Sequence, residues 1–224
     1  MENLDGRLGL AFSLYDRCDT GADIGTDHAY LPIALLKAGK CRRMILTDIS
    51  EGALENAREH IARAGLTDRV RFRLGDGLGA LDAPAGMISI LGMGGKTIRN
   101  ILEEGRERLG GAPLILSAHT DLPHVRRGVM NIGYHLVSED PCLAAGRYYL
   151  VMRAEPGEED MTEREIRLGR ALYRSESPAL AGWLDHRLKV LEAKKKGLLS
   201  AEHADREELA RTEEDLAFYR KKVK

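Results

Sequence analysis

The chain has 224 residues, of which 43% are hydrophobic and 31% charged, and its 34 basic and 35 acidic side chains leave a net charge of −1. This is the composition of a globular protein with room for one ordinary domain and an appendage, and no apolar run approaches the ~20 residues of a membrane span. The balanced charge gives no overall sign of a nucleic-acid partner, and three scattered cysteines without C-x-x-C spacing indicate neither a disulfide framework nor a metal site. The first residues do not resemble a signal peptide, so we expect a cytoplasmic protein.

Apolar residues recur at helical and strand spacings in turn through the first two thirds of the chain. The pattern predicts a helix over 5–17, a strand that ends near Ile24 and a helix whose first turn lies around 29–31. Further strands are expected at 43–48, 70–74, 87–91, 114–116, 134–137 and 148–152, with helices at 50–64, 96–108 and 123–131. Ser50 should cap the first of these helices and Gly65 should end it. The alternation, with two successive strands at its end, predicts an α/β fold of Rossmann type, in which helices cover both faces of a mostly parallel sheet.

The loop after the first strand says most about function. Residues 23–28 read Asp-Ile-Gly-Thr-Asp-His, where a pyrophosphate-binding loop would have the pattern G-x-G-x-x-G. Gly25 has no Cβ, so the turn can use positive φ and a ligand can approach the backbone. Asp23 and Asp27 would repel phosphates but accept hydrogen bonds from an ammonium group and a ribose, and S-adenosylmethionine carries both. The alternative is a structural strand–turn–helix unit without a ligand.

Acidic residues also follow the next two predicted strands. Asp48 ends the second strand, at the position where an acid takes ribose hydroxyls in such folds. Asp76, within Gly-Asp-Gly at 75–77, can accept a hydrogen bond from the exocyclic amine of an adenine. Because parallel strands end at the same edge of a sheet, we expect the strand-end acids to converge on one crevice. Each acid taken alone is equally compatible with a simple turn.

From residue 158 the composition changes, and no further strand is expected. Leucines recur at spacings of three, four and seven residues in two segments: Leu184, Leu188, Leu191 and Leu198, then Leu209 and Leu216. Two helices joined near 199–204 would pair as an antiparallel coiled-coil hairpin. We therefore divide the chain into an α/β domain at 1–157 and a helical coiled-coil domain at 158–224. A helical tail packed back on the first domain is the alternative.

Four features together resemble the bacterial tRNA (adenine-22-N1)-methyltransferase family: Asp-Ile-Gly-Thr-Asp-His-Ala-Tyr-Leu-Pro at 23–32, Gly-Asp-Gly at 75–77, Gly-Met-Gly-Gly at 92–95 and the helical hairpin. The resemblance covers essentially the whole chain. It implies a class I methyltransferase fold, S-adenosylmethionine as methyl donor and N1 of adenine 22 in tRNA as acceptor. One departure is visible at 117–121, which reads Ser-Ala-His-Thr-Asp where some family members have Gln-Pro-Asn. That loop faces the substrate entrance.

The resemblance also implies the positions of the binding residues. The cofactor would be held by Asp23, Gly25, Thr26, His28, Asp48, Ile49, Asp76, Gly77, Gly92 and Met93. Gly94 and Gly95, which complete the Gly-Met-Gly-Gly segment, would border the target base.

The chemistry of adenine N1 directs attention to Asp27. N1 already has an in-plane lone pair, so the main task of the site is to align it with the methyl group. The methylated base is cationic, and a nearby carboxylate would stabilise that charge or take a proton from the exocyclic amine. Asp27 is therefore the candidate catalytic residue, with helix capping as its alternative role. Tyr149 is expected to stack on the base, although a plain core tyrosine fits the sequence equally well.

The hairpin would give the protein surface with which to bind an L-shaped RNA. Lys194, Lys195 and Lys196 lie near its expected tip and would contact phosphates. We expect tRNA as the partner, no metal and no membrane, and a monomer or weak dimer. Two other functions stay open: a methyltransferase of a small molecule or protein, and a cofactor-sensing module whose coiled coil recruits a partner.

Overall fold

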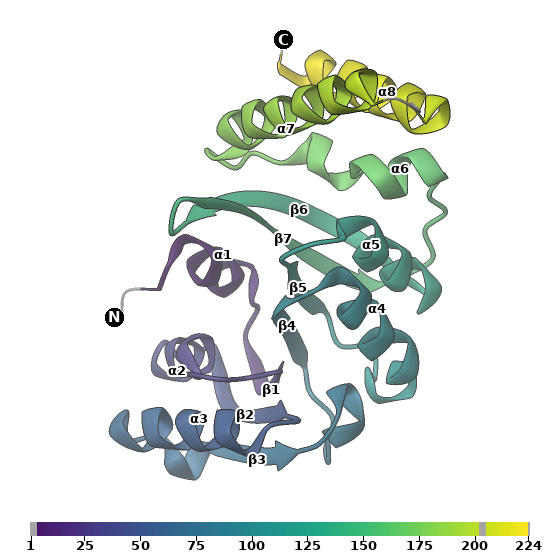
Figure 1. The fold of residues 1–224 in the computed structure, drawn as a ribbon. Helices are drawn as coiled ribbons and strands as arrows, with labels where there is room; N and C mark the ends of the chain where they lie inside the picture. The colour runs from purple at the N-terminus through teal and green to yellow at the C-terminus, as the bar shows by residue number, and fades with distance from the viewer. Residues whose placement is uncertain (1–3, 202–204, 224) are drawn as a thin grey trace.

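Seven strands form one sheet in the order β3-β2-β1-β4-β5-β7-β6 within residues 4–201 and 205–223, the part of the chain that the computed structural model describes (Figure 1). The strands are β1 (Cys18–Ile24), β2 (Cys41–Asp48), β3 (Val70–Leu74), β4 (Met87–Met93), β5 (Leu114–Ala118), β6 (Tyr134–Ala144) and β7 (Arg147–Pro156). The pairs among β1 to β5 are parallel, whereas β7 runs antiparallel to both β5 and β6. The predicted mostly parallel sheet is confirmed.

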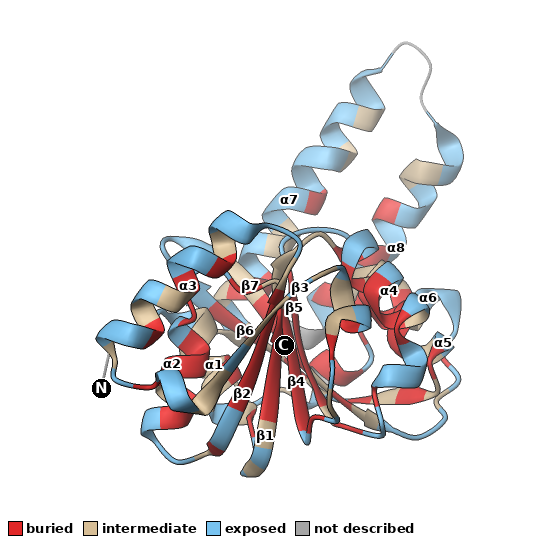
Figure 2. Ribbon diagram, turned by 90° about the horizontal axis from the view of Figure 1, so that it is seen from below, coloured by how far each residue is buried: buried red, intermediate tan, exposed pale blue. Residues whose placement is uncertain are grey.

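Helices cover both faces of this sheet, as Figure 1 shows. One face carries α1 (Gly6–Leu14), α2 (Tyr30–Lys37) and α3 (Glu51–Arg63), and the other carries α4 (Gly95–Glu104) and α5 (Leu122–Asn131). Short 3₁₀ turns lie at Thr67–Arg69, Gly77–Ala80, Arg106–Arg108 and Ala171–Arg174. The central strands are buried along most of their length (Figure 2), because apolar side chains from both helical layers pack on them.

Local signals in the sequence placed several helix ends correctly. The Ser50 side chain accepts a hydrogen bond from the Ala53 amide at 3.3 Å, and Gly65 follows α3 with φ of +71°. Pro32 lies in the first turn of α2, where its missing N–H costs no helical hydrogen bond. The helix predicted at 96–108 is shorter, since α4 ends at Glu104 and a 3₁₀ turn follows Gly105.

The last two strands are much longer than the sequence predicted. Glu139, Asp140 and Pro141 read as strand breakers, yet all three lie within β6. Tertiary contacts hold them there: Glu139 pairs with a buried arginine, and Asp140 accepts a hydrogen bond from Ser175 Oγ at 2.6 Å. Pro141 is tolerated because β6 is the edge strand of the sheet.

The C-terminal segment is helical, as expected. It contains α6 (Glu163–Leu168), α7 (Leu180–Ser200) and α8 (Arg206–Val223). Ion pairs between Glu192 and Arg220 at 3.0 Å and between Lys195 and Glu213 at 2.7 Å join α7 and α8 in antiparallel order. The two predicted helices are therefore present, while their coiled-coil packing and the domain division at 157/158 stay predictions. Residues 202–204 of the link predicted near 199–204 lie outside the described residues.

Among the described residues, it is the base of the α7–α8 pair that packs on the rest of the molecule (Figure 2). There the buried rings of Trp183 and Tyr219 meet edge to face, with centroids 5.7 Å apart, and both belong to the apolar layer that includes α4 and α5. Farther out, the helices carry mostly exposed side chains.

A buried ion pair joins α5, β6 and α6. Arg126 Nε donates to Glu139 Oε1 at 2.7 Å, and the two side chains are 2% and 0% exposed. Arg126 Nη1 also donates to the carbonyls of Ile166 at 2.9 Å and Arg167 at 3.2 Å. Gly169, with φ of +92°, passes so close that a Cβ there would lie 2.6 Å from Arg126 Nη2.

Removing one partner of this pair should destabilise the protein strongly. In Glu139→Ala, the charge of Arg126 would stay buried without its counterion, so we expect the free energy of unfolding to fall by about 3–5 kcal/mol. Urea denaturation followed by circular dichroism measures this change.

The neighbouring pair provides a matched control. Arg127 bonds Glu163 at 2.6 Å, but the Glu163 side chain is 77% exposed. Glu163→Ala should lower the free energy of unfolding far less, because water solvates the Glu163 carboxylate and screens the pair. Equal losses in the two variants would contradict the special role of the buried pair.

Candidate functional site

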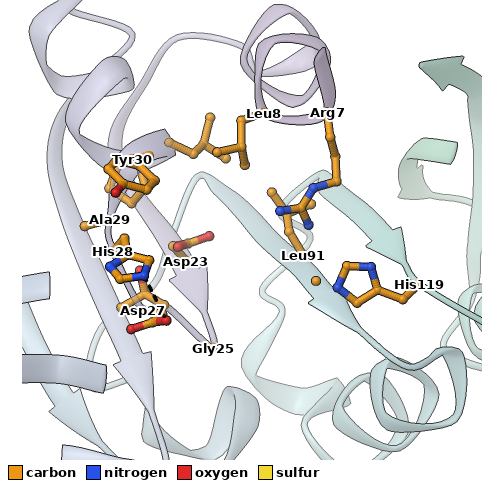
Figure 3. Close-up of a pocket in the computed structure, with 14 residues that line it drawn as sticks. Arg7, Leu8, Asp23, Gly25, Asp27, His28, Ala29, Tyr30, Leu91 and His119 are labelled. Atoms are coloured by element: carbon orange, nitrogen blue, oxygen red, sulfur yellow. Dashed lines mark ion pairs between the residues drawn. The ribbon is translucent and has the colours of Figure 1, made fainter. Parts of the chain in front are cut away.

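A cavity of about 290 Å³ lies where β1 and β4 end (Figure 3). β1 stands between β2 and β4, so the strand order reverses at this point, and open α/β sheets bind ligands at such a reversal. Six residues predicted from the sequence line the cavity: Asp23, Gly25, Thr26, Asp27, His28 and Gly92. Of the three strand-end acids expected to converge on one crevice, Asp23 lines this cavity, whereas Asp48 and Asp76 do not.

Packing from two sides fixes the loop after β1. Gly25 has φ of +76°, and a Cβ on it would lie 1.9 Å from Met93 Cε, so no larger residue fits without moving Met93. The amides of Gly25 and Thr26 both donate to the Thr47 carbonyl, at 2.8 and 3.0 Å. These two amides are thus used by the neighbouring strand β2.

Asp23 presents a buried carboxylate to the cavity. It is 8% exposed, and Ser89 Oγ donates to its Oδ1 at 2.6 Å. Burial raises the pKa of Asp23, while the hydrogen bond from Ser89 and the positive charge of Arg7 act in the opposite direction. The negative charge of Asp48, at the end of β2, also acts to raise the pKa of Asp23, at the end of β1.

Asp27 lies on the exposed side of the same loop. Asn56 Nδ2 of α3 donates to Asp27 Oδ1 at 3.1 Å, and His28 Nε2 is 3.3 Å from Asp27 Oδ2. The residue that caps α2 is Ala29, in the left-handed region with φ of 54°, and no side chain completes this cap. The alternative role of Asp27 as the cap of α2 is therefore not observed.

Three rings gather beside this loop. The centroids of His28, Tyr30 and His60 are 5.4 to 5.5 Å apart, and their planes are inclined by less than 30°. His60 Nδ1 is 2.9 Å from the His28 carbonyl oxygen, which ties α3 to the loop. His60 was not predicted as a site residue, because nothing in the local pattern of a surface helix distinguishes it.

Five predicted cofactor residues lie outside the lining of this cavity: Met93 of β4, and four residues at the ends of β2 and β3. Asp48 Oδ1 accepts a hydrogen bond from the Ser50 amide at 2.7 Å, and the next residue, Ile49, is 73% exposed. Asp76 is exposed after β3, and Gly77, with φ of +50°, opens a 3₁₀ turn. β2 and β3 run parallel to β1, so these residues share its edge of the sheet.

The glycines that begin α4 differ from one another in surroundings. Gly94 is the residue that caps α4 and is partly exposed. Gly95 is buried, its amide donates to the Thr120 carbonyl at 3.0 Å, and a Cβ on it would lie 2.2 Å from the Asp121 carbonyl oxygen. Gly95 thus allows the loop between β5 and α5 to approach α4, a packing role that the sequence did not reveal.

Arg7 and His119 complete the cavity and were not predicted as site residues. A Cβ on Gly92, which has φ of +81°, would lie 3.2 Å from Arg7 Nη1 and 3.6 Å from His119 Nε2. Arg7 Nη1 is buried without a hydrogen-bond partner. Figure 3 shows Arg7 and His119 across the cavity from Asp27 and His28. His119 belongs to the loop that departs from the family pattern, whereas Arg7 lies on α1 without any local motif.

A second cavity, of about 430 Å³, contains Tyr149 and also His119. The Tyr149 ring meets His119 at a centroid distance of 5.7 Å, and the guanidinium of Arg7 lies 5.5 Å from the Tyr149 centroid. Tyr149 is therefore not a plain core residue, since one side of it borders a cavity.

The three predicted lysines occupy α7 and differ in their partners. Lys194 pairs with Glu208, and Lys195 pairs with Glu213 at 2.7 Å. Lys196 is exposed, and no ion pair to another described residue is recorded for it. Two of the three charges are thus partly matched by acids on α8.

The composition of the described residues bears on the class of site. They contain no group of three or more His, Cys, Asp or Glu side chains arranged to hold a metal ion. Within the same residues, no helix combines the length and the apolar character needed to cross a bilayer.

Comparison with known proteins identifies the family. A sequence model of the tRNA (adenine(22)-N(1))-methyltransferase family matches residues 21–217. A tRNA (adenine(22)-N(1))-methyltransferase of Bacillus subtilis (strain 168) is 36% identical over 141 residues. That alignment covers 62% of this chain and 59% of the relative, which is less than two thirds of the relative's length.

Solved structures agree over nearly the whole chain. The B. subtilis m1A22 tRNA methyltransferase TrmK matches with a TM-score of 0.86 and 25% identity, covering 100% of both chains. Streptococcus pneumoniae Sp1610 in complex with S-adenosyl-L-methionine matches with a TM-score of 0.84 and 27% identity, covering 97% of this chain and 98% of the other. The shared fold includes α7 and α8, and the family model spans α7 and every lining residue of the first cavity except Arg7 and Leu8. The chain belongs to the tRNA (adenine(22)-N(1))-methyltransferase family.

Proposed function

We propose that this protein transfers a methyl group from S-adenosylmethionine to N1 of adenine 22 in tRNA. One observation carries the proposal: the family match at 21–217 includes the loop after β1 and the end of β4, whose residues line one cavity. Membership of this family favours RNA methylation over a small-molecule or protein substrate and over a sensing module.

The groups around the first cavity fit the polar parts of this cofactor. The buried Asp23 carboxylate is suited to its ammonium group, and the unpartnered Nη1 of Arg7 to its carboxylate. Asp48 and Asp76, at the ends of β2 and β3, are suited to the ribose hydroxyls and the adenine amine. Met93 closes the space above Gly25. Ile49 and Gly77 flank these acids, and Thr26 and His28 complete the loop.

The cofactor, when bound, supplies an electrophilic methyl group. The protein's own contribution is to hold the target base in line with that group and to stabilise the positive charge of the product. We assign the second task to Asp27, whose carboxylate is oriented by Asn56 and His28. Gly94 and Tyr149 are assigned to the target base, and Gly95 positions the loop that follows β5.

The partner in this proposal is tRNA, and the α7–α8 pair extends the surface available to it. Lys196 offers an exposed charge for phosphates, and Lys194 and Lys195 would exchange their acidic partners on α8 for phosphates. We place the protein in the cytoplasm, as a monomer or weak dimer, with no metal in the reaction.

The direct test is methylation of a defined RNA. The protein, labelled S-adenosylmethionine and an in vitro transcript of tRNA should yield 1-methyladenosine at position 22, mapped by mass spectrometry of nuclease fragments. A transcript with guanosine at position 22 should accept no label, since its N1 carries a proton. Label at another nucleoside, or none in any tRNA, would contradict the proposal.

Cofactor affinity should depend on the charged groups assigned above. Arg7→Gln and Asp48→Ala should each weaken binding of S-adenosylmethionine by about 1–3 kcal/mol in calorimetry, because each leaves a polar group of the cofactor without a partner. The exposed Arg17, which precedes the opposite end of β1, is the control. Arg17→Gln should leave the affinity unchanged, and the assignment fails if Arg7→Gln behaves in the same way.

Asp27→Asn should separate catalysis from binding. The amide keeps the shape of the side chain but cannot act as a base or counter a positive charge, so kcat should fall ~10²-fold or more. Cofactor affinity should change little. A kcat within a few-fold of the parent value, measured in single turnovers at saturating tRNA, would remove Asp27 from the chemistry.

A further inference from the structure

The second cavity lies between the sheet and the α7–α8 pair, and it differs in chemistry from the first. Its walls come from the loop between β5 and α5, from β7 and from α7. Its volume of about 430 Å³ is sufficient for a nucleotide.

One wall of this cavity is aromatic and rigid. Trp183 and Tyr219 are buried edge to face, and Tyr219 Oη donates to the Leu168 carbonyl at 3.0 Å. Tyr148 is held in place by Gly182, where a Cβ would lie 2.3 Å from its hydroxyl oxygen. In front of the two buried rings, the partly exposed rings of Tyr148 and Tyr149 offer flat apolar surface of the kind on which nucleobases stack.

Arg187 gives the cavity a cation without a direct ion pair. Two other arginines in the lining are already matched: Arg126 by Glu139, and Arg167 by Asp215 at 2.7 Å. Among the residues that the structure describes, Arg187 forms no ion pair with a carboxylate, and its Nε is buried without a hydrogen-bond partner. Its charge acts to lower the pKa of Asp215 from farther away and also acts on Tyr219, so Arg187 is only partly compensated. Asp121 is the one acid among the described lining residues, and it is exposed at the rim.

His119 connects this cavity with the first. It lines both, and its ring meets Tyr149 on the side of the second cavity. A planar group stacked beside Tyr149 would therefore lie next to the end of β4, where Gly92 separates Arg7 from His119. The two cavities are arranged as neighbouring subsites.

We propose that the second cavity receives the target adenosine as an extruded nucleotide, with its base on the rings of Tyr148 and Tyr149, in front of Trp183, and its 5′-phosphate on Arg187. This inference rests on the proposed function and specifies the site of its substrate. Stacking and a charge-assisted bond to the phosphate offset the cost of removing the base from the stack of the RNA. Arg187 then acts in binding and not in the chemical step.

The chain contains a reporter for this site, because Trp183 is its only tryptophan. The experiment uses the full chain saturated with S-adenosylhomocysteine, so that the cofactor cavity is occupied. Adenosine 5′-monophosphate and adenosine are then titrated separately while the fluorescence of Trp183 is followed. Both ligands should change the emission. The monophosphate should bind at least about tenfold more tightly than adenosine, as expected for a hydrogen-bonded charge pair.

Arg187→Gln should abolish the difference in affinity between the two ligands, because it should weaken the binding of the monophosphate alone. Arg187→Lys, which keeps a charge, should restore part of it. The matched control is Arg211→Gln, on the exposed side of α8 where Arg211 pairs with Glu207. This control should bind both ligands as the parent does, and unchanged thermal melting shows that each variant is folded.

Several outcomes would overturn the inference. These are a monophosphate that binds no more tightly than adenosine, or not at all, and an Arg187→Gln variant that matches Arg211→Gln. With tRNA, Arg187→Gln should raise KM roughly tenfold and leave kcat near the parent value; a fall in kcat alone would also refute it. Because the nucleotide titration needs no methyl transfer, it distinguishes failure of this subsite from failure of the proposed reaction.

Discussion

The charge of Arg126, buried between the sheet and the C-terminal helices, determines how those helices are positioned against the sheet. A guanidinium out of water must have acceptors on several sides, and here they are Glu139 of β6 and the last carbonyls of α6. Those carbonyls lack partners within their own helix, so one side chain satisfies a helix end and ties it to the sheet. α6 in turn bonds α8 through Arg167 and Asp215. The second cavity exists because this chain of bonds holds α7 and α8 beside β7.

The parts of the fold that were predicted correctly are those set by local physics. Period-2 and period-3.6 patterns located the strands and helices, and Ser50 and Gly65 marked the ends of α3 because capping depends on neighbouring residues alone. The length of β6 was not predictable in this way. Glu139 and Asp140 remain in a strand only because Arg126 and Ser175, distant in sequence, bond them there.

The candidate site divides along the same line. Asp23, Gly25 and Asp27 were identified because a strand, a tight turn and a helix occur in one short segment, and the acids after β2 and β3 followed from the rule that parallel strands end together. Arg7, His60 and Arg187 were missed. Each lies on a helix whose sequence is ordinary, and its importance comes only from what the fold brings opposite to it.

The contact between Gly25 and Met93 has a consequence for how this family can vary. Met93 Cε occupies the space that any side chain at position 25 would need, so the two positions form a single steric unit, although β1 and β4 are far apart in sequence. A larger residue at 25 requires a shorter one at 93, as well as tolerance of positive φ. In related sequences the two positions should therefore covary. The shape of the floor of the first cavity then depends on both residues together and not on either one alone.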